Sequence, residues 1–278
     1  MTIIAFSAGL AVFAFLAGLL GALTGLGGGV VIIPVLVLLF HVDIHYAMGA
    51  SLISVMATST GTTAAYLREG YTNLRIGMFL ETGAVIGAFV GALLIAFVSQ
   101  TFLTLIFSLV LLSSAYLTVK RKEEHEQYHQ SHPWAMALKL DGTYPVKKQM
   151  HSYHVQHVPL ALFIMTMAGL ISGLLGIGSG TLKVLAMDQA LRLPYKVATT
   201  TSNFMIGITA AVSAGIYFSK GYIDPTIAFP TMLGVLVGAF TGAKLLTHLR
   251  TRLLRIIFSM VLCFIALEML YKVLSGEL

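Results

Sequence analysis

Long apolar stretches separated by short polar turns run through nearly the whole chain. In the first half they cover Ile3 to Thr24, Val30 to Phe40, Tyr46 to Leu67, Ile76 to Val98 and Thr101 to Val119. In the second half they cover Pro159 to Leu175, Thr181 to Leu191, Val197 to Phe218, Thr226 to Leu246 and Leu253 to Leu274. Apolar runs of about 20 residues are typical of membrane helices. The pattern predicts an all-α integral membrane protein with about ten helical segments.

The second half of the chain repeats the first. A shift of 151 residues aligns residues 17–115 with 168–266 without a gap. The matching positions include Gly25/Gly176, Gly27/Gly178, Gly29/Gly180, Ser51/Ser202 and Tyr66/Tyr217. Membrane composition explains matching leucines, but not glycines in the same order. We therefore expect two membrane repeats, residues 1–119 and 158–278, joined by a polar loop, residues 120–157.

Each repeat contains a glycine cluster, Gly25 to Gly29 in the first and Gly176 to Gly180 in the second. A single helix from Ile3 to Phe40 would be too long for a bilayer. The clusters are therefore expected to break the chain between helical segments 1 and 2 and between segments 6 and 7.

The lysines and arginines decide between two topologies. If each broken element turns back, the repeats are inverted and fourteen Lys and Arg lie on one side, two on the other and Lys183 inside the membrane. If it crosses once, the repeats are parallel and the count is ten to six. The positive-inside rule favours the first arrangement. We expect inverted repeats in the cytoplasmic membrane, with the middle loop in the cytoplasm and both termini outside.

Composition excludes several classes of function. Of the 278 residues, 57% are hydrophobic and 10% charged, which excludes a soluble enzyme. The net charge of +6 reports membrane orientation here, so no nucleic-acid partner is expected. No nucleophile elbow, Walker loop or HExxH motif is present, and we expect neither catalysis nor a cofactor.

The glycine clusters are the strongest candidate for a site. Glycine permits an unwound backbone, and a helix that restarts after it presents amide groups and the positive end of its dipole to an anion. Two such ends facing each other would form a central anion site. The alternative is that the glycines only allow close helix crossing. The candidate binding residues here are Gly27, Gly28, Gly29, Gly178, Ser179, Gly180 and Thr181.

Lys183 lies three residues past the second cluster, where the first repeat has Ile32. A charge at the bilayer centre costs about 2.5 to 3.5 kcal/mol, so it needs a partner or a wet cavity. We expect Lys183 to contact the anion. The alternatives are that it snorkels or pairs with Asp188, although Asp188 is better placed for Arg192.

Polar side chains on the following helices complete the candidate site. Ser51 and Ser202 match across the repeat, as do Thr58 and Thr209, and Asn203 adds an amide in one half. We include Ser51, Ser202 and Asn203 as binding residues. The alternative is that such hydroxyls bond their own backbone or a neighbouring helix.

Two further membrane features are interpreted more simply. Glu81 lies inside a span; it could carry a proton, but pairing with Arg75 or Arg68 is favoured. Small-residue stripes recur in the two repeats, and we interpret them as helix packing, within the protomer or across a homodimer. They comprise Gly83, Gly87 and Gly91, and Gly234, Gly238 and Gly242.

The middle loop holds six of the nine histidines: His125, His129, His132, His151, His154 and His157. The spacings within 125–129 and 151–157 would place imidazoles on one face of a helix, as a metal site needs. No cysteine accompanies them, so a solvated, pH-sensitive loop without metal is favoured. Leu140-Asp-Gly-Thr143 is typical of a hairpin turn and could fold this part of the loop on Trp134.

The segment Gly25-Leu-Gly-Gly-Gly-Val-Val-Ile-Ile-Pro34, followed by His45-Tyr-Ala-Met-Gly-Ala-Ser51, resembles the TauE/SafE family of sulfite and organosulfonate exporters. Its echo, Gly176-Ile-Gly-Ser-Gly-Thr-Leu-Lys-Val184 followed by Leu193-Pro-Tyr-Lys-Val-Ala-Thr-Thr-Thr-Ser-Asn203, resembles the second motif of the family. Ser179 and Leu185 depart from the pattern, and both could shift the substrate.

This resemblance implies a secondary transporter that exports a small sulfur-containing anion, sulfite or an organosulfonate. The lead hypothesis places the anion between the broken-helix ends and Lys183. The alternatives are a carrier for another small anion or a metal, and a membrane sensor that acts through the histidine-rich loop.

Overall fold

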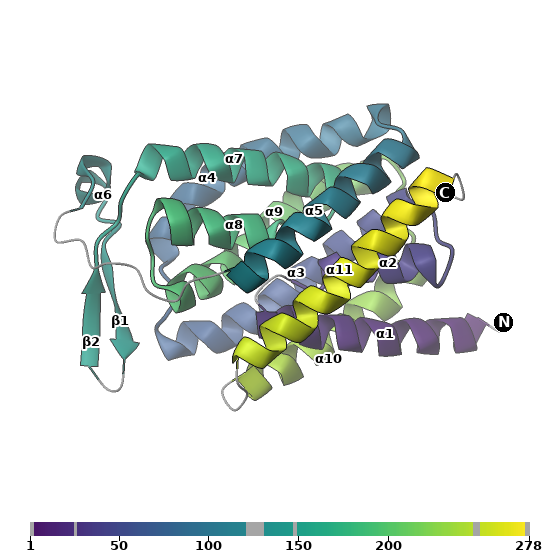
Figure 1. The fold of residues 1–278 in the computed structure, drawn as a ribbon, viewed down its shortest axis with the longest axis horizontal. Helices are drawn as coiled ribbons and strands as arrows, with labels where there is room; N and C mark the ends of the chain where they lie inside the picture. The colour runs from purple at the N-terminus through teal and green to yellow at the C-terminus, as the bar shows by residue number, and fades with distance from the viewer. Residues whose placement is uncertain (1–2, 25–26, 121–130, 147–148, 247–250, 276–278) are drawn as a thin grey trace.

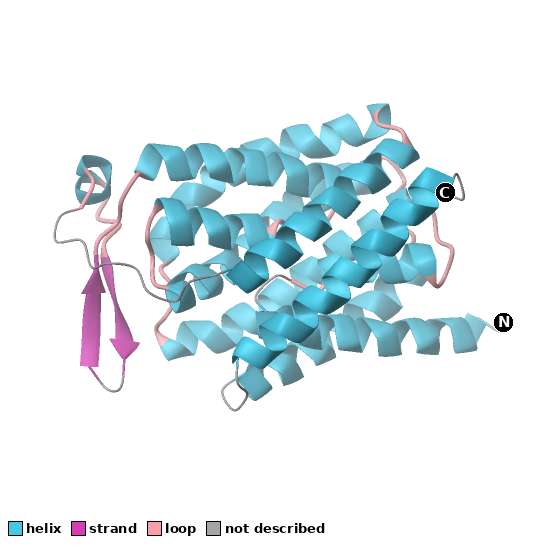
Figure 2. Cartoon of the chain, viewed as in Figure 1, coloured by secondary structure: helices cyan, strands magenta, loops and turns pink. Residues whose placement is uncertain are grey.

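The computed structural model describes all residues except 1–2, 25–26, 121–130, 147–148, 247–250 and 276–278. Within these residues the chain is an all-α membrane protein with one small β-hairpin (Figure 2). The first half contains α1 (Ile3–Thr24), α2 (Gly29–Leu38), α3 (Ile44–Glu69), α4 (Leu74–Leu94), a short 3₁₀ turn η1 (Ile95–Phe97) and α5 (Gln100–Lys120).

The second half contains α7 (Val158–Leu175), α8 (Gly180–Leu185), a π-helical stretch η2 (Ala186–Ala190), α9 (Tyr195–Ser219), α10 (Pro225–Leu246) and α11 (Thr251–Ser275). These bounds lie close to the ten predicted segments. Five described stretches are long and apolar enough to cross a membrane: 74–97, 100–117, 158–175, 195–219 and 225–242. α2, with ten residues, rises only about 15 Å and does not span a bilayer by itself.

Both broken elements turn back on themselves. The rings of Phe6, near the start of α1, and Phe40, just after α2, meet edge to face with centroids 5.3 Å apart. At the second break, the amide of Gln156 before α7 donates to the carbonyl of Leu191 after η2, at 3.2 Å. The start of α1 and the end of α11 consequently lie at one end of the molecule, and the β-hairpin lies at the other (Figure 1).

The helices of the two halves pack in corresponding pairs. α1 packs along α10 and α4 along α7, while α3 meets α9 and α5 meets α11. α1 is equivalent to α7 and α4 to α10, so the α1–α10 pair of one side corresponds to the α4–α7 pair of the other. α3 and α5 each pack against their own equivalents, α9 and α11. The inverted repeat remains a prediction, and this pairing supports it.

The glycine stripes lie in these interfaces, within one chain. A Cβ at Gly87 or Gly91 of α4 would overlap the backbone of Thr166 or Leu170 in α7. A Cβ at Gly238 of α10 would likewise overlap the backbone of Phe15 in α1, the position that matches Thr166. The packing interpretation of the stripes is therefore confirmed within the protomer.

The middle loop folds differently from the prediction. It forms α6 (Pro133–Ala137) and a hairpin of β1 (Gly142–Val146) and β2 (Gln149–Tyr153), in which Val146 pairs with Gln149. The hairpin was expected, but Gly142 is the first residue of β1 and pairs with Tyr153, so Asp141-Gly142 is not its turn. The ring of Tyr153 packs against Gly142, and a Cβ at this position would lie 2.5 Å from the Tyr153 hydroxyl. Trp134 of α6 remains half exposed.

The histidines within 151–157 do not lie on one face of a helix. His151 lies in β2, and His154 lies in the connection that follows. His157 is the residue before α7 and has a left-handed backbone, with φ of 40°. His125 and His129 lie outside the described residues. Among the residues that the structure describes, no three His, Cys, Asp or Glu side chains gather as metal ligands.

Candidate anion site at the broken helices

The two glycine clusters meet at one pair of side chains, Val55 of α3 and Ile206 of α9. Gly27 and Gly178 both have a left-handed backbone, with φ of 76° and 73°. A Cβ at Gly178 would lie 2.7 Å from Ile206 and 2.8 Å from Val55, and one at Gly27 would lie 3.8 and 4.0 Å from the same two side chains. Val55 and Ile206 occupy equivalent positions of the repeat. The clusters thus face a shared centre.

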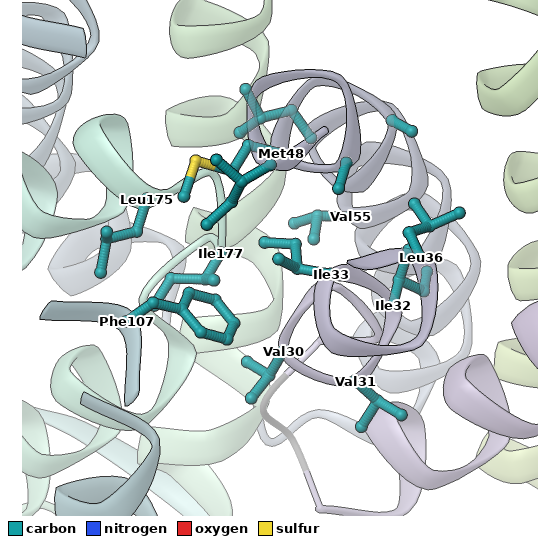
Figure 3. Close-up of a cluster of buried hydrophobic side chains, with 14 of the residues drawn as sticks. Val30, Val31, Ile32, Ile33, Leu36, Met48, Val55, Phe107, Leu175 and Ile177 are labelled. Carbon is teal, nitrogen blue, oxygen red and sulfur yellow. The ribbon is translucent and has the colours of Figure 1, made fainter. Parts of the chain in front are cut away.

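This centre is lined by apolar side chains from both halves. Val55, Ile33 and Ile177 belong to one cluster of buried apolar side chains, together with Val30 and Ile32 of α2 (Figure 3). No polar side chain comes from α2, whose sequence is GVVIIPVLVL. Of the first cluster, Gly27, Gly28 and Gly29 are all buried, and the Gly28 carbonyl accepts from the amides of Val31 and Ile32 at 3.2 Å.

The two matching serines hold the backbone of the second cluster. Ser51 donates to the carbonyl of Gly176 at 2.8 Å, and Ser202 donates to the carbonyl of Gly180 at 3.3 Å. Both side chains are fully buried. Each hydroxyl proton is therefore engaged with backbone, which is the alternative that sequence reasoning left open for these residues.

Two buried polar groups without partners belong to the second half, one in the second cluster and one on α9. Ser179 and Asn203 are each 1% exposed, and neither the Ser179 hydroxyl nor the Asn203 amide nitrogen has a hydrogen-bond partner among the described residues. The neighbour of Asn203 on α9, Ser202, donates to the carbonyl of Gly180, so α9 contacts the second cluster at this level. A buried polar group without a partner costs about 1–3 kcal/mol. The second half therefore retains donors that a ligand can use.

The second cluster has polar side chains where the first has none. Ser179 and Asn203 stand where the first half has Gly28 and Leu52, and Lys183 corresponds to Ile32. The predicted site residues thus have two different roles. The glycines provide the backbone of the breaks, and Ser51 and Ser202 hold the backbone of the second break by hydrogen bonds. The donors without a partner among the described residues, Ser179 and Asn203, both belong to the second half. Thr181 lies in α8, and its side chain is outside the described part of the chain.

Lys183 is fully buried and forms an ion pair with Glu81 of α4, with Nζ 3.0 Å from Oε2. Its Nζ also donates to the carbonyl of Met205 at 3.3 Å and to the hydroxyl of Thr209. Thr209 in turn donates to the other carboxylate oxygen of Glu81. One lysine, one carboxylate and one hydroxyl thus close a triangle that ties α4, α8 and α9 together.

This triangle corrects one predicted pairing, that of Glu81, and one alternative, that of Lys183 with Asp188. Glu81 pairs with Lys183, and not with Arg75, whose guanidinium donates to the carbonyl of Lys139 at 3.4 Å. The side chain of Arg68 lies outside the described residues. Lys183 likewise pairs with Glu81 and not with Asp188. Glu81 and Thr209 join the site as residues that sequence reasoning ranked too low. Their signal was that Glu81, like Lys183, is a charge without a counterpart in the other repeat.

Asn73, the residue before α4, docks the loop unit, which consists of α6 and the β1–β2 hairpin, on the start of α4. Its side chain donates to the Tyr153 hydroxyl at 2.7 Å and to the carbonyl of Leu140 at 3.1 Å. Asp141 stabilises the same unit by accepting from the amide of Val155 at 3.0 Å. Burial raises the pKa of the Tyr153 phenol above its usual value. Beside this contact lies a cavity of about 320 Å³, lined in part by Arg75.

Comparison with known proteins places the chain. The sequence model of the sulfite exporter TauE/SafE family matches residues 10–269. The chain belongs to this family. It is similar to a probable membrane transporter protein of Bacillus subtilis, YdhB, with 30% identity over 83% of this chain and 86% of that protein.

A second relative from Bacillus subtilis, the probable membrane transporter protein YunE, is 28% identical over 95% of this chain and 97% of its own. A probable membrane transporter protein of Xylella fastidiosa is 26% identical over 92% of both chains. No solved structure gives a significant match. The protein is thus a multi-pass membrane transporter of the TauE/SafE type.

Proposed function

We propose that this transporter exports a small sulfur-containing anion, sulfite or an organosulfonate, across the cytoplasmic membrane. The observation that carries the proposal is two buried donors without a hydrogen-bond partner among the described residues, the Ser179 hydroxyl in the second glycine cluster and the Asn203 amide on α9. Ser179 lies one helical turn before Lys183. Sulfite and sulfonate groups present three oxygens that accept such hydrogen bonds. The description of the family supports the same substrate class.

The anion is held at the second cluster in this proposal. Its oxygens accept from the Ser179 hydroxyl and the Asn203 amide, and Lys183 supplies the positive charge. The backbone of Gly180, the first residue of α8, allows close approach because a residue without a side chain leaves the amide open. Ser51 and Ser202 keep that backbone in place through their bonds to Gly176 and Gly180.

Orientation follows from charge. The predicted topology puts fourteen lysines and arginines on the side of the loop, residues 120–157, so we place that side in the cytoplasm and both termini outside. Movement of α1–α10 and α4–α7, as two packed pairs, against the central helices would expose the site to each side in turn.

Sulfite flux in proteoliposomes tests the proposal. Wild-type protein should move sulfite with saturable kinetics, and organosulfonates such as taurine should compete. Sulfate competition then measures how narrow the substrate class is. Absence of saturable sulfite or taurine flux in folded wild-type protein would overturn the proposal.

A further inference from the structure

In the triangle of Glu81, Lys183 and Thr209 the positive and negative charges cancel, and binding of an anion would add a negative charge. In the structure the ammonium of Lys183 is compensated by the Glu81 carboxylate at 3.0 Å, and both side chains are buried, with exposed fractions of 0% and 4%. The net charge of the pair is zero. An anion that takes Glu81's place beside Lys183 leaves the carboxylate buried without a counter-ion.

Breaking a buried pair in this way is costly, because a charge without compensation remains in a low-dielectric interior. The cost disappears if the displaced carboxylate takes up one proton, since burial penalises only its charged form. The neutral carboxyl can keep its contact with Thr209, whose hydroxyl lies against Glu81. The site then has zero net charge both empty and loaded with a monovalent anion.

We propose that Glu81 is the coupling residue of the transporter and carries one proton in the same direction as each anion. This inference rests on the proposed anion transport. On loading, an O–H bond forms on Glu81 with a proton from the side that supplies the anion, while Lys183 remains an ammonium and pairs with the anion. On the far side the anion leaves, Glu81 returns its proton to water and the Glu81–Lys183 pair forms again.

Among the described residues, the other charged group on α4 besides Glu81 is Arg75, whose guanidinium donates to the carbonyl of Lys139. α7, which packs along α4, has no titratable side chain, and α8 contributes Lys183. On α9, Tyr195 and Lys196 lie more than two turns before Thr209, and Tyr217 lies two turns after it. Asp188 of η2 has other interactions. Lys183 is the charged group whose Coulomb field acts on Glu81.

The test uses labelled sulfite and proteoliposomes at zero membrane potential, with the outside more acidic than the lumen. Protein-free vesicles run in parallel measure the passive distribution of sulfite. Early in the time course, before passive entry of the protonated form reaches the same distribution, wild-type protein should accumulate sulfite inside above the protein-free level, because inward protons drive it. Glu81→Gln imitates the protonated carboxyl, so it should lose this accumulation and still exchange labelled for unlabelled sulfite.

Two further variants complete the test. Glu81→Asp keeps a titratable carboxyl and should retain some accumulation. Glu268→Gln, which removes an exposed glutamate of α11, should behave as wild type.

The inference is overturned if wild-type sulfite flux ignores the pH gradient, or if Glu81→Gln accumulates sulfite as wild type does. It is also overturned if folded Glu81→Gln loses exchange, because the neutral residue would then not be the form that carries the anion. Failure of the proposed function looks different, since wild-type protein would then move no sulfite under any gradient.

Discussion

The hydroxyl of Ser51 donates to the carbonyl of Gly176, 125 residues further along the chain, at 2.8 Å. This bond joins α3 of the first half to the glycine cluster of the second. Through it and the shared contact with Val55 and Ile206, the two broken elements form one structural unit. The same unit explains why small changes at its glycines should have large effects.

Substitution at Gly178 tests the close packing of this centre. Gly178→Ala combines a strained left-handed backbone with overlap of Val55 and Ile206. Overpacking typically costs about 1–3 kcal/mol, so the thermal midpoint in detergent should fall clearly. Gly221→Ala is the matched control, because Gly221 has φ of 77° but nothing within 4 Å of its Cβ position. Equal losses in the two variants would show that the shared centre is not closely packed.

The helix interfaces between the two halves give a second prediction. Gly87→Ala places a methyl group against the backbone of Thr166, which cannot give way as a flexible side chain can. We expect a loss of about 1–3 kcal/mol or failure to fold, measured by size-exclusion profile and thermal midpoint. Gly215→Ala in α9 has open space around it and should leave both unchanged. A Gly87→Ala protein as stable as wild type would contradict the α4–α7 packing.

The Glu81–Lys183 pair separates stability from transport. Lys183→Met leaves Glu81 buried without its counter-ion and should destabilise the protein by up to about 3–5 kcal/mol at alkaline pH, where the carboxyl does not take up a proton. Replacing both residues, as Lys183→Met with Glu81→Leu, removes both charges and should restore most of the stability. Sulfite flux should remain absent in the double variant. A double variant that transports like wild type would show that the pair is only structural.

Docking of the loop should depend on pH through Tyr153. Its pKa is raised by burial, so the folded state binds the phenolic proton more tightly than the undocked state. The contribution to docking is complete below pH about 10 and is lost as the pH rises through the raised pKa. Trp134, the single tryptophan, reports on the loop by fluorescence. Tyr153→Phe should abolish this alkaline change in emission; an unchanged profile would assign it to other tyrosines.

More of the fold than of the site could be predicted from the sequence. Apolar stretches fix where helices begin and end, and the glycine clusters marked both turns, because bilayer thickness limits helix length. The prediction placed the hairpin turn wrongly, because Asp-Gly is a common turn sequence. In the structure Asp141 instead accepts from the amide of Val155, and Gly142 leaves room for Tyr153. Such contacts depend on tertiary structure, and local sequence does not encode them.

The partner of Lys183 illustrates the same limit. Glu81 lies 102 residues away from Lys183 along the chain. Local spacing instead suggested Arg75 as the ion-pair partner of Glu81 and Asp188 as a possible partner of Lys183. The useful signal was asymmetry, because both charges break an otherwise matching repeat. Ser179 and Asn203 show that asymmetry too, and it places the donors of the proposed site in the second half.

If an anion binds the Ser179 hydroxyl and the Asn203 amide, Asn203→Asp removes one of these two donors. The substitution keeps the size of the side chain but replaces an amide donor with a carboxylate that repels anions. Thr199→Val is the control, because Thr199 lies one turn earlier in α9 and also has an unpartnered hydroxyl. The account predicts that saturable sulfite flux is lost in folded Asn203→Asp and kept in Thr199→Val. Wild-type sulfite flux in Asn203→Asp, with unchanged KM, would contradict it.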